Sequence, residues 1–71
     1  MRHYKRAGEL VPGDIFVERG QEFWVIANGP GVIPNIVDVT VECLKSQRLE
    51  IISFFRVNRV EMTGADDVAA E

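Results

Sequence analysis

The stretch Ile36-Val37-Asp38-Val39-Thr40-Val41-Glu42-Cys43-Leu44 has the most regular pattern in this chain of 71 residues. Its odd positions from Val37 to Cys43 are apolar, whereas Asp38, Thr40 and Glu42 between them are polar. Alternation with a period of two is typical of a strand that buries one of its faces. The stretch therefore predicts a β-strand whose side chains at 37, 39, 41 and 43 face a core.

Shorter strands are predicted on both sides of this one. Residues 15–18 and 22–27 flank Arg19-Gly20-Gln21, which predicts a hairpin with a tight turn. Residues 28–35 contain two prolines and two glycines and predict the longest loop. The chain reverses at Lys45-Ser46-Gln47-Arg48, and a further strand is predicted over 49–54. The alternation slips by one residue at 58–59, which predicts a bulge or 3₁₀ turn before a last strand at Val60–Met62.

These elements predict an all-β domain, most simply a small five-stranded SH3-like barrel. Barrel closure removes the exposed sheet edges that a domain of this size would otherwise carry. The barrel is expected over residues 9–62, with an N-terminal arm over 1–8 and a flexible acidic tail over 63–71. A split β-sandwich or an OB-like barrel is the alternative architecture.

Composition and charge narrow the setting in which the protein works. Hydrophobic residues make up 46% of the chain, which is enough for a folded core. Cys43 is the only cysteine, so no intramolecular disulfide can form, and this favours a reducing compartment. No apolar run approaches the roughly 20 residues of a membrane helix, and no signal peptide is recognised, so we expect a cytoplasmic protein. The net charge of −3 disfavours binding to nucleic acid through charge alone.

The residues that could carry chemistry do not form a catalytic or metal-binding pattern. His3 is the only histidine, and a zinc site needs several converging ligands. The strand parity of Cys43 places its thiol in the core rather than in a reactive site. Gly29-Pro30-Gly31 lacks the lysine and helix start of a phosphate-binding loop. We therefore expect no enzyme activity, cofactor, metal or small-molecule substrate.

Apolar side chains that strand parity turns away from the core are the most informative residues for function. With Phe23 and Val25 inward, parity predicts an outward patch made of Phe16, Trp24, Ile26, Ile52 and Phe54. Exposed apolar patches of this size mark interfaces. The alternative is that the N-terminal arm or the 28–35 loop covers the patch. Trp and Arg are common at binding hot spots, so Arg48, Arg56 and Arg59 complete the candidate partner-binding set.

Several of these segments resemble a known domain. The matching segments are Leu10-Val11-Pro12-Gly13-Asp14-Ile15-Phe16-Val17, Gly20-Gln21-Glu22-Phe23-Trp24-Val25-Ile26, and the hairpin from Val37 through Lys45-Ser46-Gln47-Arg48 to Phe54. They resemble the KOW-like N-terminal domain of the bacterial elongation factor P family, over about residues 9–62. The resemblance implies an SH3-like barrel. The family's loop after the second strand carries a modified lysine, but residues 28–35 here contain no lysine, and the family's OB-fold domains have no counterpart. A stand-alone domain with the same barrel is what the resemblance implies.

Three functions follow as hypotheses. The leading one is a non-enzymatic module that binds a protein partner, or a second copy of itself, through the outward apolar patch. The first alternative is an RNA- or ribosome-associated KOW-like domain, in which aromatic and arginine side chains contact bases. The second alternative is a structural subunit of a phage or bacterial assembly, in keeping with a composition rich in Val, Ala, Gly and Arg.

Overall fold

The computed structural model describes residues 3–63, which form six β-strands and one 3₁₀ turn. The turn, η1, spans Ala7–Glu9, and no α-helix occurs among these residues, so none could cross a membrane. The strands are β1 (His3–Arg6), β2 (Ile15–Glu18), β3 (Gln21–Pro30), β4 (Ile36–Cys43), β5 (Leu49–Phe55) and β6 (Arg59–Met62). The domain is therefore all-β, as predicted, but it has six strands where five were expected.

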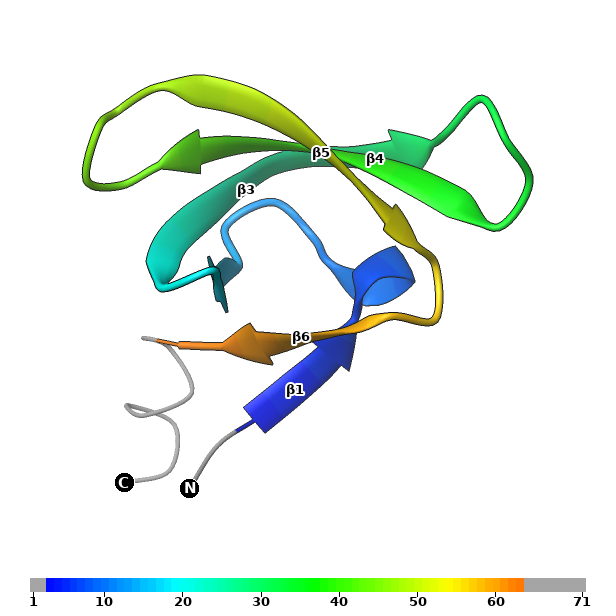
Figure 1. The fold of residues 1–71 in the computed structure, drawn as a ribbon, viewed down its shortest axis with the longest axis horizontal. Helices are drawn as coiled ribbons and strands as arrows, with labels where there is room; N and C mark the ends of the chain where they lie inside the picture. Colours follow the sequence, from blue (N-terminus) through cyan, green and yellow to red (C-terminus); the bar gives the residue numbers. More distant parts are fainter. Residues whose placement is uncertain (1–2, 64–71) are drawn as a thin grey trace.

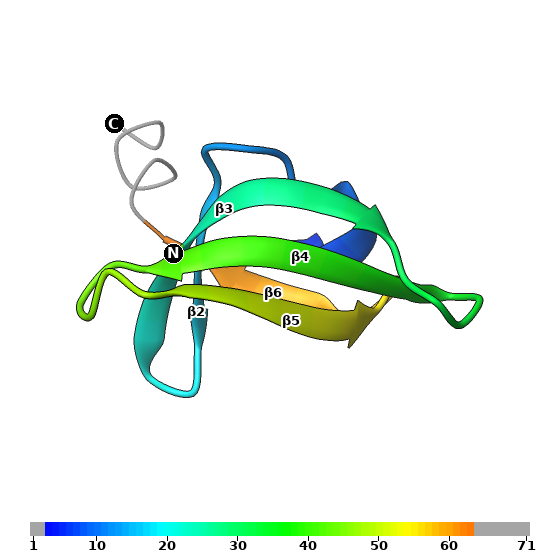
Figure 2. The same ribbon diagram turned by 90° about the horizontal axis from the view of Figure 1, so that it is seen from above.

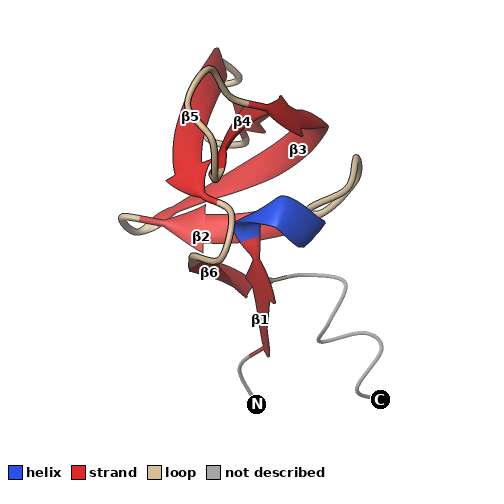
Figure 3. Ribbon diagram, turned by 90° about the vertical axis from the view of Figure 1, so that its right-hand side faces the viewer, coloured by secondary structure: helices blue, strands red, loops and turns tan. Residues whose placement is uncertain are grey.

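All strand pairs are antiparallel, in the order β1-β6-β2-β3-β4-β5. Strands β2 to β5 follow one another as a meander, and β6 returns to pair with β2. The sheet folds into two layers, with β3, β4 and β5 above and β1, β6 and β2 below (Figures 1 and 3). Within residues 3–63 the sheet does not close, because β1 pairs only with β6 and β5 pairs only with β4.

The bend between the layers is made by the long strand β3. Its first residues pair with β2, and the strand continues along β4 to Pro30. The register shifts between Val25 and Ala27, which leaves Ile26 as a β-bulge. A bulge increases local twist and bends the strand, so β3 can contribute to both layers. The predicted loop is accordingly shorter than 28–35, because Asn28, Gly29 and Pro30 belong to β3.

The core fills the space between the layers. β4 alternates as predicted, with its four odd-numbered side chains buried. Phe16 is completely buried, and its ring centroid lies 5.6 Å from that of Phe23 and 5.8 Å from that of Phe54. The full set of buried apolar residues is Ala7, Leu10, Phe16, Phe23, Val25, Val37, Val39, Val41, Cys43, Phe54, Val60 and Met62.

In β2 and β5, the side chains that were predicted to face outward face the core instead. Phe16 was expected outward, but the two-residue turn at Arg19 and Gly20 pairs it with the inward Phe23. Cross-strand partners share a face, so Phe16 must point into the core. In β5, pairing with Val37 turns Phe54 inward for the same reason, and Ile52 follows it and is partly buried.

No strand was expected in the N-terminal arm, but residues 3–6 form β1 and pair with β6. The Lys5 ammonium contacts the Asp14 carboxylate at 2.8 Å, and the side-chain amide of Asn28 donates to the carbonyls of Ala7 (2.9 Å) and Leu10 (3.0 Å). These contacts hold the N-terminal segment against the sheet. The sequence does not predict a strand at residues 3–6, because these four residues have no apolar alternation. The predicted acidic tail lies outside the described residues apart from Thr63, whose N–H donates to the Ile15 carbonyl.

Candidate interaction surface

The most apolar exposed surface lies on β3, β4 and β5, on the side facing away from the core. We call it the outer face. Its cross-strand rows follow from the register and are Trp24–Glu42–Leu49, Ala27–Thr40–Ile51, Gly29–Asp38–Ser53 and Ile36–Phe55. The exposed fractions are 42% for Trp24, 38% for Ile26, 68% for Leu49, 68% for Ile51 and 65% for Phe55. We call these five side chains the apolar stripe. Trp24 and Ile26 lie on β3 and the other three on β5, and the polar Glu42 and Thr40 of β4 lie between the two groups.

The structure divides the predicted patch into two groups. Trp24 and Ile26 are exposed on the outer face, as predicted. Phe16 and Phe54 lie in the core and Ile52 packs against it, so these three were assigned to the wrong side. Their places on the outer face are taken by Leu49, Ile51 and Phe55, which the sequence analysis missed because the phase of β5 was inverted.

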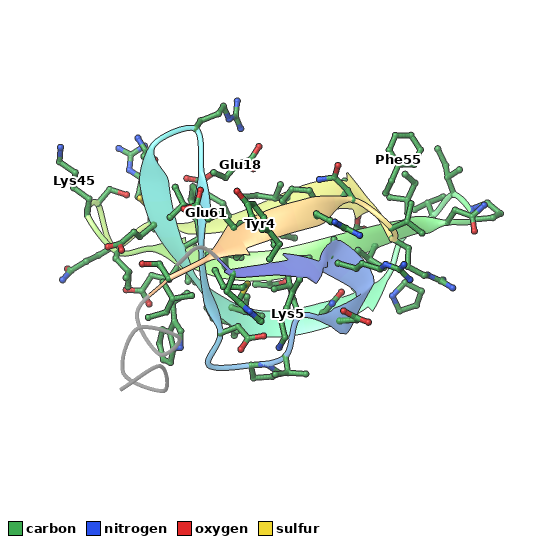
Figure 4. All side chains as sticks on the ribbon, turned by 90° about the horizontal axis from the view of Figure 1, so that it is seen from below. Tyr4, Lys5, Glu18, Lys45, Phe55 and Glu61 are labelled. Carbon is green, nitrogen blue, oxygen red and sulfur yellow. The ribbon has the colours of Figure 1, made fainter. Side chains whose placement is uncertain are left out.

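Nothing within residues 3–63 covers the outer face. The N-terminal arm pairs with β6 in the lower layer, on the far side of the core. The loop after β3 points its own apolar residues outward, with Val32 97% exposed. In Figure 4, Phe55 projects from the end of the molecule opposite Lys45. Among the described residues, the covered-patch alternative is therefore wrong.

Polar residues on the outer face are acidic or neutral. Glu42 follows Trp24 in one row, and Asp38 accepts a hydrogen bond of 2.7 Å from the Ser53 hydroxyl in another. The four rows contain no Lys or Arg. The face therefore combines an apolar stripe with negative charge.

The predicted arginines do not join the outer face or each other as a group. Arg48 lies in the turn before β5, and Arg56 directly follows the other end of that strand. The eight residue steps between them correspond to roughly 25 Å along a strand. Arg59 lies opposite Arg6 in the β1–β6 pair, and Arg6 and Arg56 line one surface groove with Gly8, Glu9 and Val57. The structure thus brings Arg56 and Arg59 near Arg6, a residue that the sequence analysis did not select, and separates Arg48 from them.

Cys43 is buried, as its strand parity predicted. Hydrogen bonds from the side chain and backbone of Ser46 lower the pKa of the Cys43 thiol, against the opposing effect of burial. Its sulfur also lies 3.5 Å from Gln21 Oε1. In residues 3–63 no three His, Cys, Asp or Glu side chains gather in a way that could hold a metal ion.

Asn28 is the polar residue with the most structural consequence, and the sequence analysis placed it only in a loop. Its Nδ2 holds the N-terminal segment, whereas its buried Oδ1 has no hydrogen-bond partner among the described atoms. The side chain lines a surface groove of about 380 Å³ together with Gly8, Leu10, Gly29, Pro30, Val37 and Arg56.

Comparison with known proteins gives no relative: no protein-family model and no curated protein matches this chain.

Proposed function

We propose that this domain is a non-enzymatic interaction module that binds a protein partner through the outer face of β3, β4 and β5. The observation that carries the proposal is the exposure of Trp24 on β3 and of Leu49 and Ile51 on β5, on the same face of the sheet and one strand apart. A large exposed apolar patch on a small soluble domain costs solvation free energy, of about 25 cal/mol for each Å² left in water. A partner that covers the stripe recovers this free energy.

We also propose that β2 to β6 correspond to an SH3-like barrel of the KOW-like type, to which β1 adds a further strand. The strand order β6-β2-β3-β4-β5, in which the last strand returns to the first, supports this assignment. The bend of β3 at its bulge supports it as well, because one strand then serves both layers. The likeness concerns the architecture and carries no function by itself.

Charge on the outer face restricts the partner. Glu42 stands between Trp24 and Leu49, Asp38 stands between Gly29 and Ser53, and cationic side chains are absent from the four rows. Complementary interfaces place positive groups opposite negative ones, around an apolar centre. The expected partner surface therefore places a Lys or Arg opposite Glu42, between apolar groups that meet Trp24 and Leu49.

Trp24 is the first residue to test. It lies on β3, beside Ile15 on β2 and Glu42 on β4. A tryptophan at the centre of an interface typically contributes more than 2 kcal/mol, so Trp24→Ala should weaken binding about 30-fold or more. Val11→Ser removes an exposed apolar side chain that lies before β2 and in none of the four rows of the outer face, and it should leave the affinity unchanged.

The experiment uses the immobilised domain to recover a partner from an extract of the native host. The purified partner is then titrated with wild type, Trp24→Ala and Val11→Ser, after circular dichroism has established that all three are folded. A folded Trp24→Ala that binds as tightly as wild type contradicts the proposal. So does equal weakening by Val11→Ser.

A second candidate, binding of RNA, is favoured by one specific observation. Arg6 and Arg59 lie directly opposite each other in the β1–β6 pair, and Arg56 shares a groove with Arg6. Like charges in that position repel, and an anion such as a phosphate group relieves the repulsion. Single-stranded RNA should then bind with an affinity that falls steeply with salt. Arg59→Gln should weaken it, while Arg48→Gln at the far end of β5 should not. Absence of binding at low salt removes this candidate.

A further inference from the structure

The two edges of the sheet differ in how well they resist pairing with another chain. The β1 edge has four residues and carries Lys5 and Arg6. The β5 edge has seven residues, LEIISFF, with neither Lys nor Pro. Short length, lysine and proline are means by which an edge strand avoids pairing. The β5 edge has none of these three protections.

Hydrogen bonds at the two ends of β5 show which of its backbone groups point outward. The Cys43 N–H donates to the Arg48 carbonyl at 2.9 Å, and the Arg56 N–H donates to the Asn35 carbonyl at 2.7 Å. In an antiparallel pair, every second residue directs its N–H and C=O to the partner strand. The even-numbered residues of β5 therefore bond to β4, and the backbone groups of the odd-numbered residues point away from it.

The C-terminal end of β5 is not available for pairing with another chain. The Phe55 carbonyl accepts a hydrogen bond from the Asn58 N–H, and the Arg56 carbonyl accepts one from the Gly8 N–H of η1. The strand ends at Phe55, and η1 lies beside this end. An added strand therefore has to pair with the part of β5 that precedes Phe55.

The remaining outward backbone groups belong to Leu49, Ile51 and Ser53, and we call these three residues the free edge. Within residues 3–63, β5 pairs with no strand other than β4, and the N–H and C=O groups of the free edge have no hydrogen-bond partner. β5 runs along one border of the upper layer (Figure 2), and all three residues are exposed. Their donors and acceptors recur at every second residue, about 7 Å apart.

We propose that the free edge binds an extended segment of the protein partner, which adds to the sheet as a strand beside β5. An extended backbone presents its own donors and acceptors at the same spacing as the free edge, so it satisfies the whole row. A segment of about five residues spans the free edge. In this mode of binding, main-chain hydrogen bonds supply affinity and side chains supply specificity.

The side chains of β5 define the chemistry of this segment. Leu49 and Ile51 lie on the outer face and are each 68% exposed, so the segment residues opposite them are apolar. The segment residue between these two turns to the other side of the sheet, beside Glu50. The Glu50 side chain is exposed and forms no ion pair within residues 3–63, so a Lys or Arg is favoured there. The segment therefore alternates apolar residues with a cation.

A second copy of this chain fits the free edge less well than a separate segment. If two copies paired about Ile51, residues 56–57 of each copy would lie opposite residues 45–46 of the other. Both pairs of residues belong to turns, and η1 lies beside the first of them. A segment of about five residues ends before it reaches either turn.

The inference rests on the proposed function, because the segment belongs to the partner that covers the outer face. An added strand continues the outer face beyond Leu49 and Ile51. Trp24 lies on β3, so β4 and β5 separate it from the added strand. Pairing of a short segment with the free edge is therefore independent of the Trp24 side chain.

The probe is a synthetic hairpin peptide closed by a D-Pro-Gly turn, whose pairing strand reads Thr-Val-Val-Lys-Ile. Antiparallel to β5, this strand places its threonine opposite Ser53, its lysine opposite Glu50 and its isoleucine opposite Leu49. The turn holds the strand extended and lowers the entropic cost of binding. The control peptide has the same sequence with N-methyl groups on the residues opposite Leu49 and Ile51, which removes two donors to β5.

Amide-resolved hydrogen exchange measured by NMR follows the binding. In the free domain, the Ile51 and Ser53 amides should exchange faster than those of Glu50 and Ile52, which donate to β4. Saturating hairpin peptide should slow exchange at Ile51 and Ser53 about tenfold or more, and the N-methylated peptide should not. No slowing at the free edge, or equal slowing by both peptides, overturns the proposal.

Ser53→Pro removes one outward N–H without removing a β4–β5 hydrogen bond. It also removes the hydroxyl that donates to Asp38 at 2.7 Å, so Ser53→Ala, which removes the hydroxyl and keeps the N–H, is the matched control. Ser53→Pro should raise the dissociation constant of the hairpin peptide about tenfold or more, and Ser53→Ala should leave it unchanged. Equal affinities of the two variants, both folded by circular dichroism, overturn the proposal. If Ser53→Pro does not fold, the exchange experiment decides.

Trp24→Ala separates this inference from the proposed function. It should bind the hairpin peptide as wild type does, while it loses the protein partner. If the peptide protects the free edge but Trp24→Ala keeps the partner, only the proposed function fails. If Trp24→Ala loses the partner but wild type gains no protection at the free edge, only the strand pairing fails. A wild type that sediments as a dimer, with its free edge protected before peptide is added, assigns this edge to a second copy and also overturns the proposal.

Discussion

Replacement of Asn28 by alanine should separate the N-terminal segment from the rest of the sheet. The Asn28 amide donates to two carbonyl oxygens, at 2.9 Å and 3.0 Å, that lie 21 and 18 residues earlier in the chain. Loss of two hydrogen bonds costs about 1 kcal/mol each, and an acceptor left without a partner adds to the cost. The Ala7 carbonyl retains a bond of 3.3 Å from the Leu10 N–H, whereas the Leu10 carbonyl retains none that the described residues provide.

The expected destabilisation is about 2–3 kcal/mol, a large fraction of the 5–15 kcal/mol that holds a typical domain. For a domain of this size that corresponds to a fall in Tm of about 10–20 °C. Asn28→Asp should cost more at neutral pH, because a carboxylate places negative charge against the same two carbonyl oxygens. Asn58→Ala, at an exposed asparagine, should change stability by less than about 0.5 kcal/mol.

Urea denaturation followed by far-ultraviolet circular dichroism gives the free energy of unfolding for each variant. Hydrogen exchange at the Ala7 and Gly8 amides locates the effect, since both donate to carbonyls of residues 56–58. An Asn28→Ala variant as stable as Asn58→Ala would refute the assigned role of this side chain. So would a loss of stability without faster exchange in the N-terminal segment.

Three other expectations follow from single side chains. Phe16→Leu should lower the free energy of unfolding by about 1–2 kcal/mol, because the Phe16 side chain is buried against two aromatic rings, and Trp24→Ala should lower it by less. Equal losses in urea denaturation would contradict the inward position of Phe16 on β2. Gly20→Ala should lower the free energy of unfolding by about 1 kcal/mol, because φ is +76° at Gly20. Gly29→Ala should be neutral or stabilising, because Gly29 has an ordinary φ and open space around it. The reverse order of melting temperatures would contradict the turn at Arg19 and Gly20. Because the pKa of Cys43 is lowered in the folded state, folding should gain stability as pH rises from that lowered value to the ordinary thiol pKa, above which the gain is complete. Ser46→Ala should reduce this gain, and a pH profile identical for the two proteins would exclude the Ser46 contribution.

The sequence predicts well those parts of the fold that carry their own periodicity. β4 alternates over eight residues, so both its identity and its buried side follow from the residues alone. The first part of β3 is predicted equally well, including the outward position of Trp24, because Phe23 and Val25 alternate with it. The pattern stops at the bulge, since one extra residue at Ile26 reverses the parity of all that follows in β3.

The inward and outward sides of β2 and β5 depend on turns rather than on the strands themselves. In β2, Ile15, Phe16 and Val17 are all apolar, and only the turn at Arg19 and Gly20 decides which one meets Phe23. In β5, the apolar residues stand on both faces, and Gln47 adopts φ +61° to set the turn that fixes the register. The strand conformation of β1 depends on its pairing with β6 and on the contacts of Lys5 and Asn28, and no local sequence pattern predicts these interactions.

The candidate surface was therefore only partly predictable. Trp24 and Ile26 came from a strand with a clear phase, whereas Leu49, Ile51 and Phe55 required the β4–β5 register. The grouping of Arg56 and Arg59 with Arg6 required the pairing of β1 with β6, which brings residues 3–6 beside residues 59–62.

Fluorescence of Trp24 tests the outer face most directly, because it is the only tryptophan in the chain. The free domain should emit as a solvent-exposed indole that acrylamide quenches, and the emission should shift to shorter wavelength and become protected when the captured partner is added. A shielded indole in the free monomer, or an emission that the bound partner leaves unchanged, would contradict an exposed binding face at Trp24.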